Sequence, residues 1–228
     1  MENWLSRETA LIGEEAVERL KKSSVLIFGI GGVGGYCVEA LARAGVGALT
    51  LVDHDRVGIT NLNRQIIATI STLDMPKTEA AARRITDINP ECKVKCVTEF
   101  AEAGNIAAII EDAEPDYIID AIDCVTSKLL IAEYAVSHSI PLISSMGTGN
   151  KLDPEKLKIV DISKTHTCPL ARVMRRELGQ RGIKHLTVLF SEEPPVKVGM
   201  RTPASVSFVP SSAGLMIAGY CIRKMIEV

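Results

Sequence analysis

Residues 23–53 read SSVLIFGIGGVGGYCVEALARAGVGALTLVD, and this stretch decides the fold class. Its apolar run Val25–Phe28 predicts a strand that is covered on both faces. Gly29, Gly31 and Gly34 then occupy the first, third and sixth positions of a GxGxxG pattern. In such a turn the first glycine lets the chain bend sharply and the second lets backbone N–H groups approach a phosphate. The third lets the following helix pack closely on the strand.

A helix and a second strand complete this unit. The helix is predicted over residues 33–43, and its N-terminus, together with Gly32, faces a bound anion. The second strand, Leu49–Val52, ends at Asp53, whose carboxylate is placed to accept hydrogen bonds from a ribose diol. The acid lies 19 residues beyond Gly34. This context indicates nucleotide binding, with NAD as the default nucleotide at this point.

The composition is that of a soluble globular enzyme. The 228 residues are 46% hydrophobic and 24% charged, and the net charge of −2 argues against a protein that coats nucleic acid. The N-terminus is amphipathic and acidic, unlike a signal peptide, and the apolar stretch 213–222 is too short to span a bilayer. The six cysteines lack paired CxxC spacing, so no zinc site is expected. We therefore expect a cytoplasmic protein with a single domain over residues 1–228.

The segment after Asp53 separates two kinds of nucleotide-binding protein. A dehydrogenase usually continues from this acid into an ordinary helix, whereas here a polar loop contains Asn61, Asn63, Arg64 and Gln65. A guanidinium beside amide side chains suits a polyphosphate better than a nicotinamide ring. A solvated turn is the alternative interpretation of this loop. The loop favours a polyphosphate ligand, and an NAD-dependent oxidoreductase stays as a distant alternative.

Further charged side chains fall where a parallel sheet binds its ligand. Pro76 marks the start of a helix, so Lys77 lies in its first turn. A lysine there opposes the helix dipole, and contact with a phosphate explains it better than helix propensity does. Asp120 and Asp123 follow a strand at its carboxyl end. Asp123 is a candidate magnesium ligand, since magnesium sites often use only one or two carboxylates. An acid that caps a helix is the alternative.

The remaining hydrophobic patterns predict a doubly wound sheet. Helices are expected over 8–21, 33–43, 76–87, 105–112, 126–138, 169–178 and 211–227, and strands over 25–28, 49–52, 92–97, 116–120 and 140–145. This series predicts a Rossmann-like, mainly parallel twisted sheet with helices on both faces. The last helix is rich in small residues, which suits close packing, for instance against a second subunit.

Residues 151–184 differ in charge from the rest of the chain. They carry nine Lys or Arg against four acids, so the segment is +5 in a chain that is −2 overall. On the helix expected there, Arg172, Arg175 and Arg176 fall on one side. A solvated face is the ordinary interpretation, and a contact surface for the phosphate backbone of a nucleic acid is the functional one. The substrate-facing segment, about 151–205, includes a proline-containing loop or lid over 191–203.

Taken in order, the motifs GIGGVG, VDHD, TNLNRQ, MPK and AIDC resemble the adenylating core of the ThiF/MoeB/HesA family, the bacterial relatives of ubiquitin-activating enzymes. This resemblance covers residues 6–150. The later segments KTHTCPLARVMRRELGQRGI and FSEEPP are similar to one branch of the family, the tRNA threonylcarbamoyladenosine dehydratases. The resemblance implies a ThiF-like fold, ATP and Mg²⁺ as cofactors, and tRNA as the substrate.

The resemblance also implies roles for individual residues. The implied nucleotide-binding residues are Gly29, Gly31, Gly32, Gly34, Asp53, Asn61, Arg64, Gln65 and Lys77. The implied catalytic residues are Arg7, Arg64, Lys77 and Asp123. Asp123 would hold magnesium or position the α-phosphate. Arg7 would reach into the site of the neighbouring subunit, which implies a homodimer.

The implied reaction is adenylation of the threonyl carboxylate of the modified tRNA, followed by ring closure that releases AMP. Activation of the C-terminus of a ubiquitin-like sulfur-carrier protein is the alternative, and the missing zinc pairs weigh against it. Cys124 stands where the family often has asparagine, and Cys168 is the only loop candidate for a thioester cysteine. Whether either thiol is reactive, whether a sulfur-relay protein is a partner and whether a monovalent cation is needed stay open.

Overall fold

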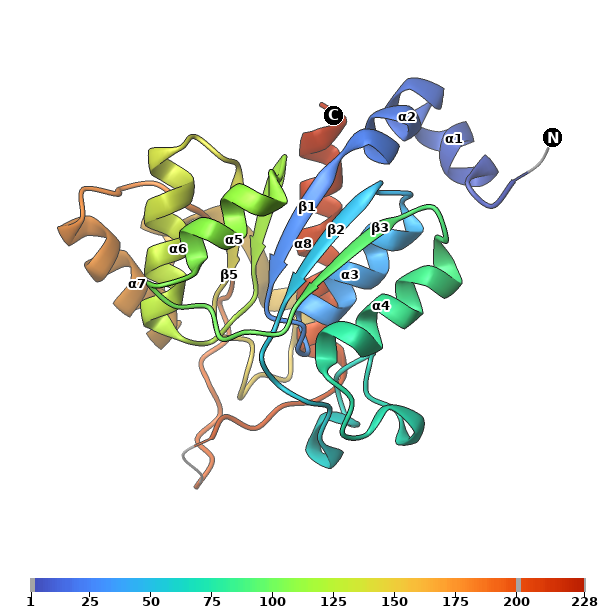
Figure 1. Cartoon of the computed structure of the whole chain (residues 1–228). Coiled ribbons are helices and arrows are strands. Elements are labelled where there is room, and N and C mark those ends of the chain that lie inside the picture. Colours follow the sequence, from blue (N-terminus) through green and yellow to red (C-terminus); the bar gives the residue numbers. More distant parts are fainter. Residues whose placement is uncertain (1–2, 200–201, 228) are drawn as a thin grey trace.

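The computed structural model describes residues 3–199 and 202–227 and is built around a seven-stranded sheet (Figure 1). Strands β1 to β7 span Ser24–Phe28, Ala48–Val52, Lys93–Val97, Tyr117–Asp120, Leu142–Ser145, Leu157–Asp161 and Thr187–Ser191. Their order in the sheet is β3-β2-β1-β4-β5-β7-β6, and each pair is parallel except β6 with β7. The predicted Rossmann-like, mainly parallel sheet is confirmed.

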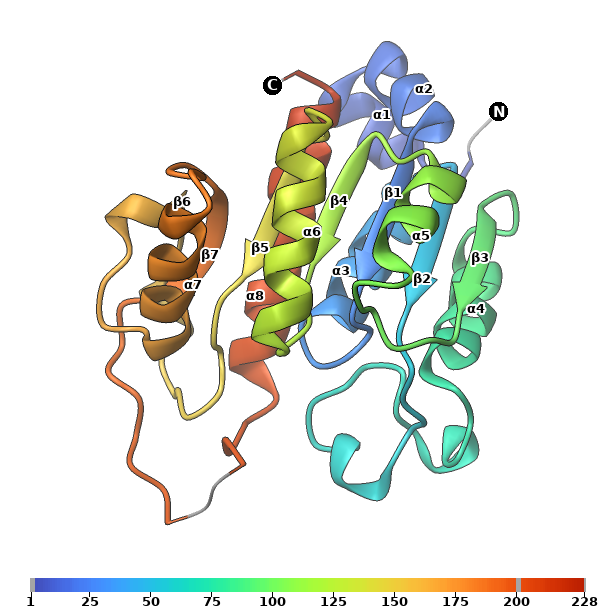
Figure 2. The same ribbon diagram turned by 60° about the vertical axis from the view of Figure 1, so that its left-hand side comes forward.

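Helices cover both faces of the sheet (Figures 1 and 2). Helices α1 to α8 span Ser6–Ile12, Glu14–Lys22, Gly34–Arg43, Lys77–Ile88, Ile106–Ala113, Val125–Ser137, Pro169–Gln180 and Phe208–Met225. Alternate residues of β1 enter opposite cores: Val25 and Ile27 pack with α3, α4 and α8, whereas Leu26 and Phe28 pack with α5, α6 and α7. Among the described helices, none has the length and apolar character needed to cross a membrane.

Three features differ from the sequence-based expectations. The helix expected over 8–21 is broken into α1 and α2 because Gly13 adopts a left-handed φ of +87°. Strands β6 and β7 were not predicted, and they extend the sheet with one antiparallel edge strand. The small-residue helix α8 starts at Phe208 and packs on α3 of the same chain, where a Cβ on Gly214 would lie 2.8 Å from the Cβ of Tyr36.

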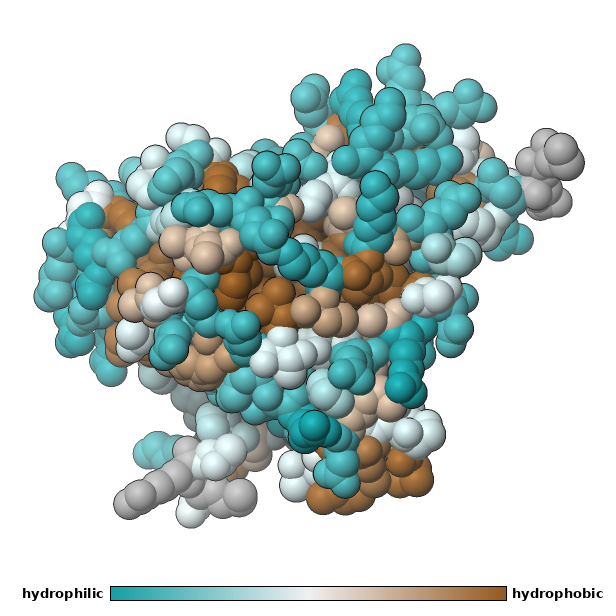
Figure 3. All heavy atoms as spheres, in the orientation of Figure 1, coloured by the Kyte–Doolittle hydropathy of each residue, from teal (hydrophilic) through white to brown (hydrophobic). Residues whose placement is uncertain are grey.

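The chain order creates a ligand-binding edge at the carboxyl ends of the strands. The chain moves outward from β1 through β2 to β3 and then returns to place β4 on the other side of β1, which makes a topological switch point. The loop between β2 and α4 lies just beyond this edge (Figure 2). Its outer side exposes Ile59 and Ile70, and Figure 3 shows apolar surface at this end of the molecule.

Candidate functional site

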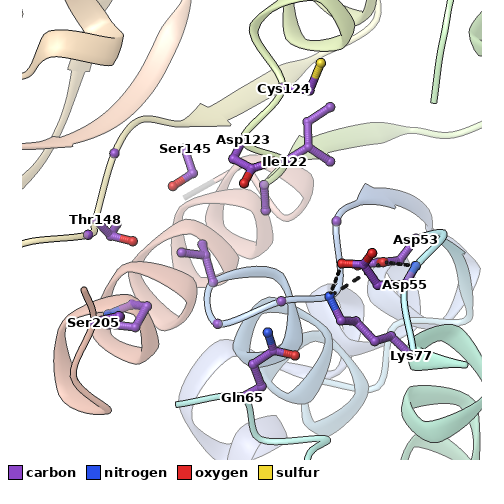
Figure 4. Close-up of a pocket in the computed structure, with 18 of the residues that line it drawn as sticks. Asp53, Asp55, Gln65, Lys77, Ile122, Asp123, Cys124, Ser145, Thr148 and Ser205 are labelled. Carbon is purple, nitrogen blue, oxygen red and sulfur yellow. Dashed lines mark hydrogen bonds and ion pairs between the residues drawn. The ribbon is translucent and has the colours of Figure 1, made fainter. Parts of the chain in front are cut away.

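A cavity of about 580 Å³ opens at the switch point between β1 and β4. It gathers nine of the sequence-predicted site residues, namely Gly29, Gly31, Gly32, Asp53, Asn61, Arg64, Gln65, Lys77 and Asp123. Figure 4 shows side chains from β2, β4, β5 and the loop after β2 converging on this space. A single cavity with few, convergent polar groups is the usual form of a small-molecule site.

The three glycines of the turn have different surroundings. Gly29 has a φ of +86°, and a Cβ there would lie 2.8 Å from the carbonyl oxygen of Ala121. Gly34 packs against the Gly29 backbone, so it shapes the fold and lies outside the cavity lining. Gly31 lines the cavity, and a Cβ there would come no closer than 3.7 Å, to Nε2 of Gln65. Of these three, the second glycine has the most open surroundings at the cavity, which suits the close approach of a phosphate to the backbone.

Asp53 is buried and held in a fixed orientation at the end of β2. Its Oδ2 accepts a hydrogen bond from the N–H of Ile30 at 2.7 Å, and its Oδ1 accepts one from the N–H of Asp55 at 2.9 Å. A carboxylate has about four lone-pair sites, so both oxygens can still accept from a ribose diol. The glycine turn and the acid that the sequence placed 19 residues later are thus joined by a direct hydrogen bond.

Lys77 is the first residue of α4 and is 5% exposed. Its Nζ lies 2.7 Å from Oδ2 of Asp55 and 3.8 Å from Oδ1 of Asp53. Burial raises the pKa of Asp55, but the hydrogen bond and positive charge of Lys77 outweigh it, so this pKa is lowered. Asp53, His54 and Asp55 bring three possible metal-ligand atoms within 4.8 Å of one another. A cation placed there would compete with the ammonium group of Lys77.

The polar loop after β2 forms the floor of the cavity. The Oδ1 of Asn61 accepts a hydrogen bond from the N–H of Gly58 at 2.9 Å, which holds the turn. Arg64 donates to the Thr60 carbonyl oxygen at 2.8 Å. Gln65 is 6% exposed, and its Oε1 has no hydrogen-bond partner in the described structure. A buried unpaired amide oxygen costs about 1–3 kcal/mol, so a bound ligand or its water would relieve this cost.

The two acids at the end of β4 have different environments. Asp123 is exposed at the cavity, across from Lys77 in Figure 4. Asp120 is 1% exposed and forms an ion pair with Lys128, with Nζ–Oδ2 of 2.9 Å. Only Asp123 is therefore available to a ligand. The sequence reasoning missed Lys128, although it carries the same signal as Lys77, a lysine in the first turn of a helix.

The cavity wall also contains an apolar surface that the sequence reasoning missed. Phe100 and Ala101 follow β3, and Ile122 follows β4. Phe100 is 45% exposed and meets His54 edge to face, with ring centroids 4.9 Å apart. This surface lies beside Asp53, so it suits the base of a nucleotide whose ribose is held by that carboxylate. An aromatic residue three positions after the end of β3 was the available signal.

Two cysteines near the cavity differ in accessibility. Cys124 lines the cavity at the N-terminus of α6, and hydrogen bonds with Ser127 and with the backbone lower the pKa of its thiol. Cys168 is 3% exposed and packs beside Gly147. Cys168 is therefore poorly placed to attack a substrate.

The predicted arginines other than Arg64 lie outside the cavity, on α1 and α7. Arg7 is exposed on α1, at the opposite end of the strands from the cavity of its own chain (Figure 1). On α7, Arg175 donates to the carbonyl oxygen and hydroxyl of Thr165 at 2.7 and 2.6 Å, so it holds a loop of its own chain. Arg172 and Arg176 are exposed on α7, and Arg176 pairs with the adjacent Glu177.

Comparison with known proteins gives a consistent result. The sequence profile of the ThiF family matches residues 5–227. A Bacillus subtilis protein named tRNA threonylcarbamoyladenosine dehydratase is 42% identical over 97% of this chain and 94% of its own length. The crystal structure of the Escherichia coli tRNA N6-threonylcarbamoyladenosine dehydratase in complex with ATP has a TM-score of 0.91 and 34% identity, covering 98% of this chain and 93% of that one. Its complex with AMP also has a TM-score of 0.91 and 34% identity, covering 96% and 92%.

Proposed function

This chain belongs to the ThiF family, and from that membership we propose that it is an ATP-dependent tRNA threonylcarbamoyladenosine dehydratase. The observation that carries the proposal is the nearly end-to-end similarity to proteins of that name, one of them solved with ATP. The cavity supports the proposal because it combines an open glycine turn, a fixed ribose-binding acid, a buried lysine and an apolar surface for a base. These four features suit the binding of ATP and the stabilisation of charge on its phosphates.

The first chemical step is adenylation of the threonyl carboxylate. A carboxylate oxygen attacks the α-phosphorus of ATP, the bond from that phosphorus to the bridging oxygen breaks, and pyrophosphate leaves. Lys77 and Arg64 both line the cavity. In the proposed reaction their charges would stabilise the negative charge that develops on the phosphates. Positioning and electrostatic stabilisation supply most of the catalysis in reactions of this type.

The second step is ring closure within the same substrate. A nitrogen of the side chain attacks the acyl carbon, the bond from that carbon to the AMP oxygen breaks, and the nitrogen loses its proton. The sum of both steps removes one water from the nucleoside while ATP becomes AMP and pyrophosphate. An intramolecular attack has a high effective molarity and needs no enzyme nucleophile. This agrees with the burial of Cys168.

Magnesium fits the exposed carboxylate of Asp123, because Mg²⁺ is commonly held by one or two carboxylates and the phosphates of a substrate. When bound, it would neutralise charge on the phosphates. A dependence on Mg²⁺ that weakens in Asp123→Asn would support this role. Comparing rates in potassium and sodium salts tests the need for a monovalent cation.

The proposed partners are a tRNA substrate and a second copy of the chain. On α7, Arg172 is the best candidate for a phosphate contact because Arg175 and Arg176 already have partners within the chain. The exposed Ile59 and Ile70 near the cavity, with Leu11 beside Arg7 in α1, support burial of these surfaces in a homodimer. Light scattering of the parent tests the dimer. A sulfur-relay protein stays a candidate partner, and a tRNA substrate fits a cytoplasmic location.

The test is pyrophosphate release from ATP with three substrates offered separately: threonylcarbamoyl-modified tRNA, unmodified tRNA and a sulfur-carrier protein. We expect release with the modified tRNA alone. Lys77→Ala should abolish it, whereas Lys22→Ala, which removes an exposed lysine at the far end of the strands, should not. Release with the carrier protein instead would favour the alternative activity. Release with none of the three would contradict adenylation altogether.

A further inference from the structure

Lys128 is buried in a position that neither helix propensity nor packing explains. It lies in the first turn of α6 and is 0% exposed. A positive charge near a helix N-terminus opposes the helix dipole, and removing a charge from water is costly even when it is paired. An apolar side chain would fill the same space at lower cost. The lysine therefore needs a reason beyond the stability of the core.

The contacts of Lys128 provide that reason. Its Nζ donates to the Ser145 carbonyl oxygen at 2.8 Å and to the Ile122 carbonyl oxygen at 3.1 Å, and it pairs with Asp120 at 2.9 Å. An ammonium group has three donors, and these three acceptors use all of them. The hydroxyl of Ser144 donates to the same Asp120 oxygen at 2.6 Å. One buried group thus ties together the carboxyl ends of β4 and β5.

Both tied segments form the wall of the cavity. Ile122 and Ser145 line it, and Asp123 is the residue directly after Ile122. Asp120 also accepts a hydrogen bond from the N–H of Ile122 at 3.3 Å, which fixes the turn that leads to Asp123. The nucleotide-binding groups on β1 and β2 make none of these contacts. The ion pair is therefore specific to the side of the cavity that carries Asp123.

We infer that Lys128 and Asp120 are positioning residues for the adenylation step, acting by holding the 121–124 turn so that Asp123 stands at the α-phosphate of ATP. This inference rests on the proposed function. The opposite charges of the pair largely cancel at a distance, so we assign its effect to the hydrogen bonds that hold the turn. A displacement of about 1 Å in such a site can cost ~100-fold in rate, whereas the contacts that Asp53 and Lys77 would make with ATP do not depend on this pair.

The test replaces both partners, since removing only one would leave a buried unpaired charge and destabilise the fold. The variant is Lys128→Met with Asp120→Asn, and the matched control is Glu39→Gln with Arg84→Met, which removes an ion pair between α3 and α4 away from the cavity. We expect kcat for pyrophosphate release to fall by ~10-fold or more in the test variant, with KM for ATP changed less than ~3-fold. The control should keep both values.

Two further readouts separate positioning from a merely structural role. Adding the test substitutions to Asp123→Asn should cost little further activity, because residues that act through one another are not additive. Hydrogen exchange should accelerate at residues 121–124 and stay unchanged in β2, residues 48–52, which β1 separates from β4. An unchanged kcat, full additivity with Asp123→Asn, or unchanged exchange at 121–124 would each overturn the inference. A parent without activity on modified tRNA would contradict the proposed function, while the exchange result would still decide this inference.

Discussion

Gly34 and Gly31 belong to one motif, yet the structure predicts opposite consequences for the same substitution. A Cβ added at Gly34 would overlap the carbonyl oxygen of Gly29 and lie 2.9 Å from its carbonyl carbon. Carbon atoms pack at about 3.5–4.0 Å, so α3 would have to move away from β1. A Cβ added at Gly31 would meet nothing closer than 3.7 Å, but it would point into the cavity where a phosphate must approach the backbone.

These distances set the expected magnitudes. Overpacking costs about 1–3 kcal/mol or more, and the backbone contact at Gly34 belongs at the upper end, offset by up to about 1 kcal/mol of helix propensity. Gly34→Ala should therefore lose about 2 kcal/mol of unfolding free energy, which lowers Tm by about 4–8 °C for a chain of this size. Gly31→Ala should stay within about 0.5 kcal/mol of the parent. Its affinity for ATP should fall at least ~10-fold, or about 1.4 kcal/mol.

Thermal unfolding and titration calorimetry with ATP distinguish the two variants. The expected pattern is a destabilised Gly34→Ala and a stable Gly31→Ala that binds ATP poorly. A Gly34→Ala protein that melts like the parent would refute the packing role of this glycine. A Gly31→Ala protein with parental affinity would refute the placement of the phosphates over the turn.

Three other predictions follow from the surface and the titrating groups. Iodoacetamide should label Cys124 before Cys96, because the pKa of the Cys124 thiol is lowered whereas that of Cys96 is raised chiefly by burial. ATP should slow the labelling of Cys124. Mass spectrometry that finds Cys96 modified first would contradict this prediction. Burial raises the pKa of Glu39, but its hydrogen bonds with Arg84 and Arg43 outweigh burial, so this pKa is lowered in the folded protein. The ionised Glu39 therefore stabilises the fold above the ordinary glutamate pKa. This stability is lost as the pH falls through the lowered pKa. Glu39→Gln should accordingly flatten the loss of Tm between about pH 5 and pH 3, and an unchanged slope would count against the pair. Arg172→Glu should raise KM for tRNA while KM for ATP stays constant. The log–log slope of tRNA affinity against salt concentration should fall by ~1. Equal effects on both substrates would argue against a phosphate contact.

The sequence was informative where the determining interactions are local. The glycine turn and Asp53 belong to one βαβ unit, so their spacing carries most of the information about their arrangement. Lys77 was recognisable because a lysine at a helix start has no local explanation. Its partner Asp55 was not singled out, because the contact crosses from the loop after β2 to the start of α4.

Features that depend on tertiary packing were not predictable in the same way. The pairing of Asp120 with Lys128 requires β4, β5 and α6 to be in place. The sequence pattern places Asp120 and Asp123 at the same edge of the sheet, so it does not show that only one of them faces the cavity. Arg175 falls on the same side of α7 as its basic neighbours, but only the packing of the Thr165 loop shows that it serves the chain itself. Strand β6 was missed because it is a half-exposed edge strand without a strong apolar run.

The most direct test of the proposed activity is the mass of the nucleoside after reaction. Threonylcarbamoyl-modified tRNA would be incubated with the protein, ATP and Mg²⁺, digested gently and analysed by liquid chromatography with mass spectrometry. The proposed dehydration predicts a modified nucleoside lighter by the mass of one water, formed with AMP in equal amount and absent when ATP is omitted. An unchanged nucleoside, recovered from a protein that binds ATP normally, would contradict it.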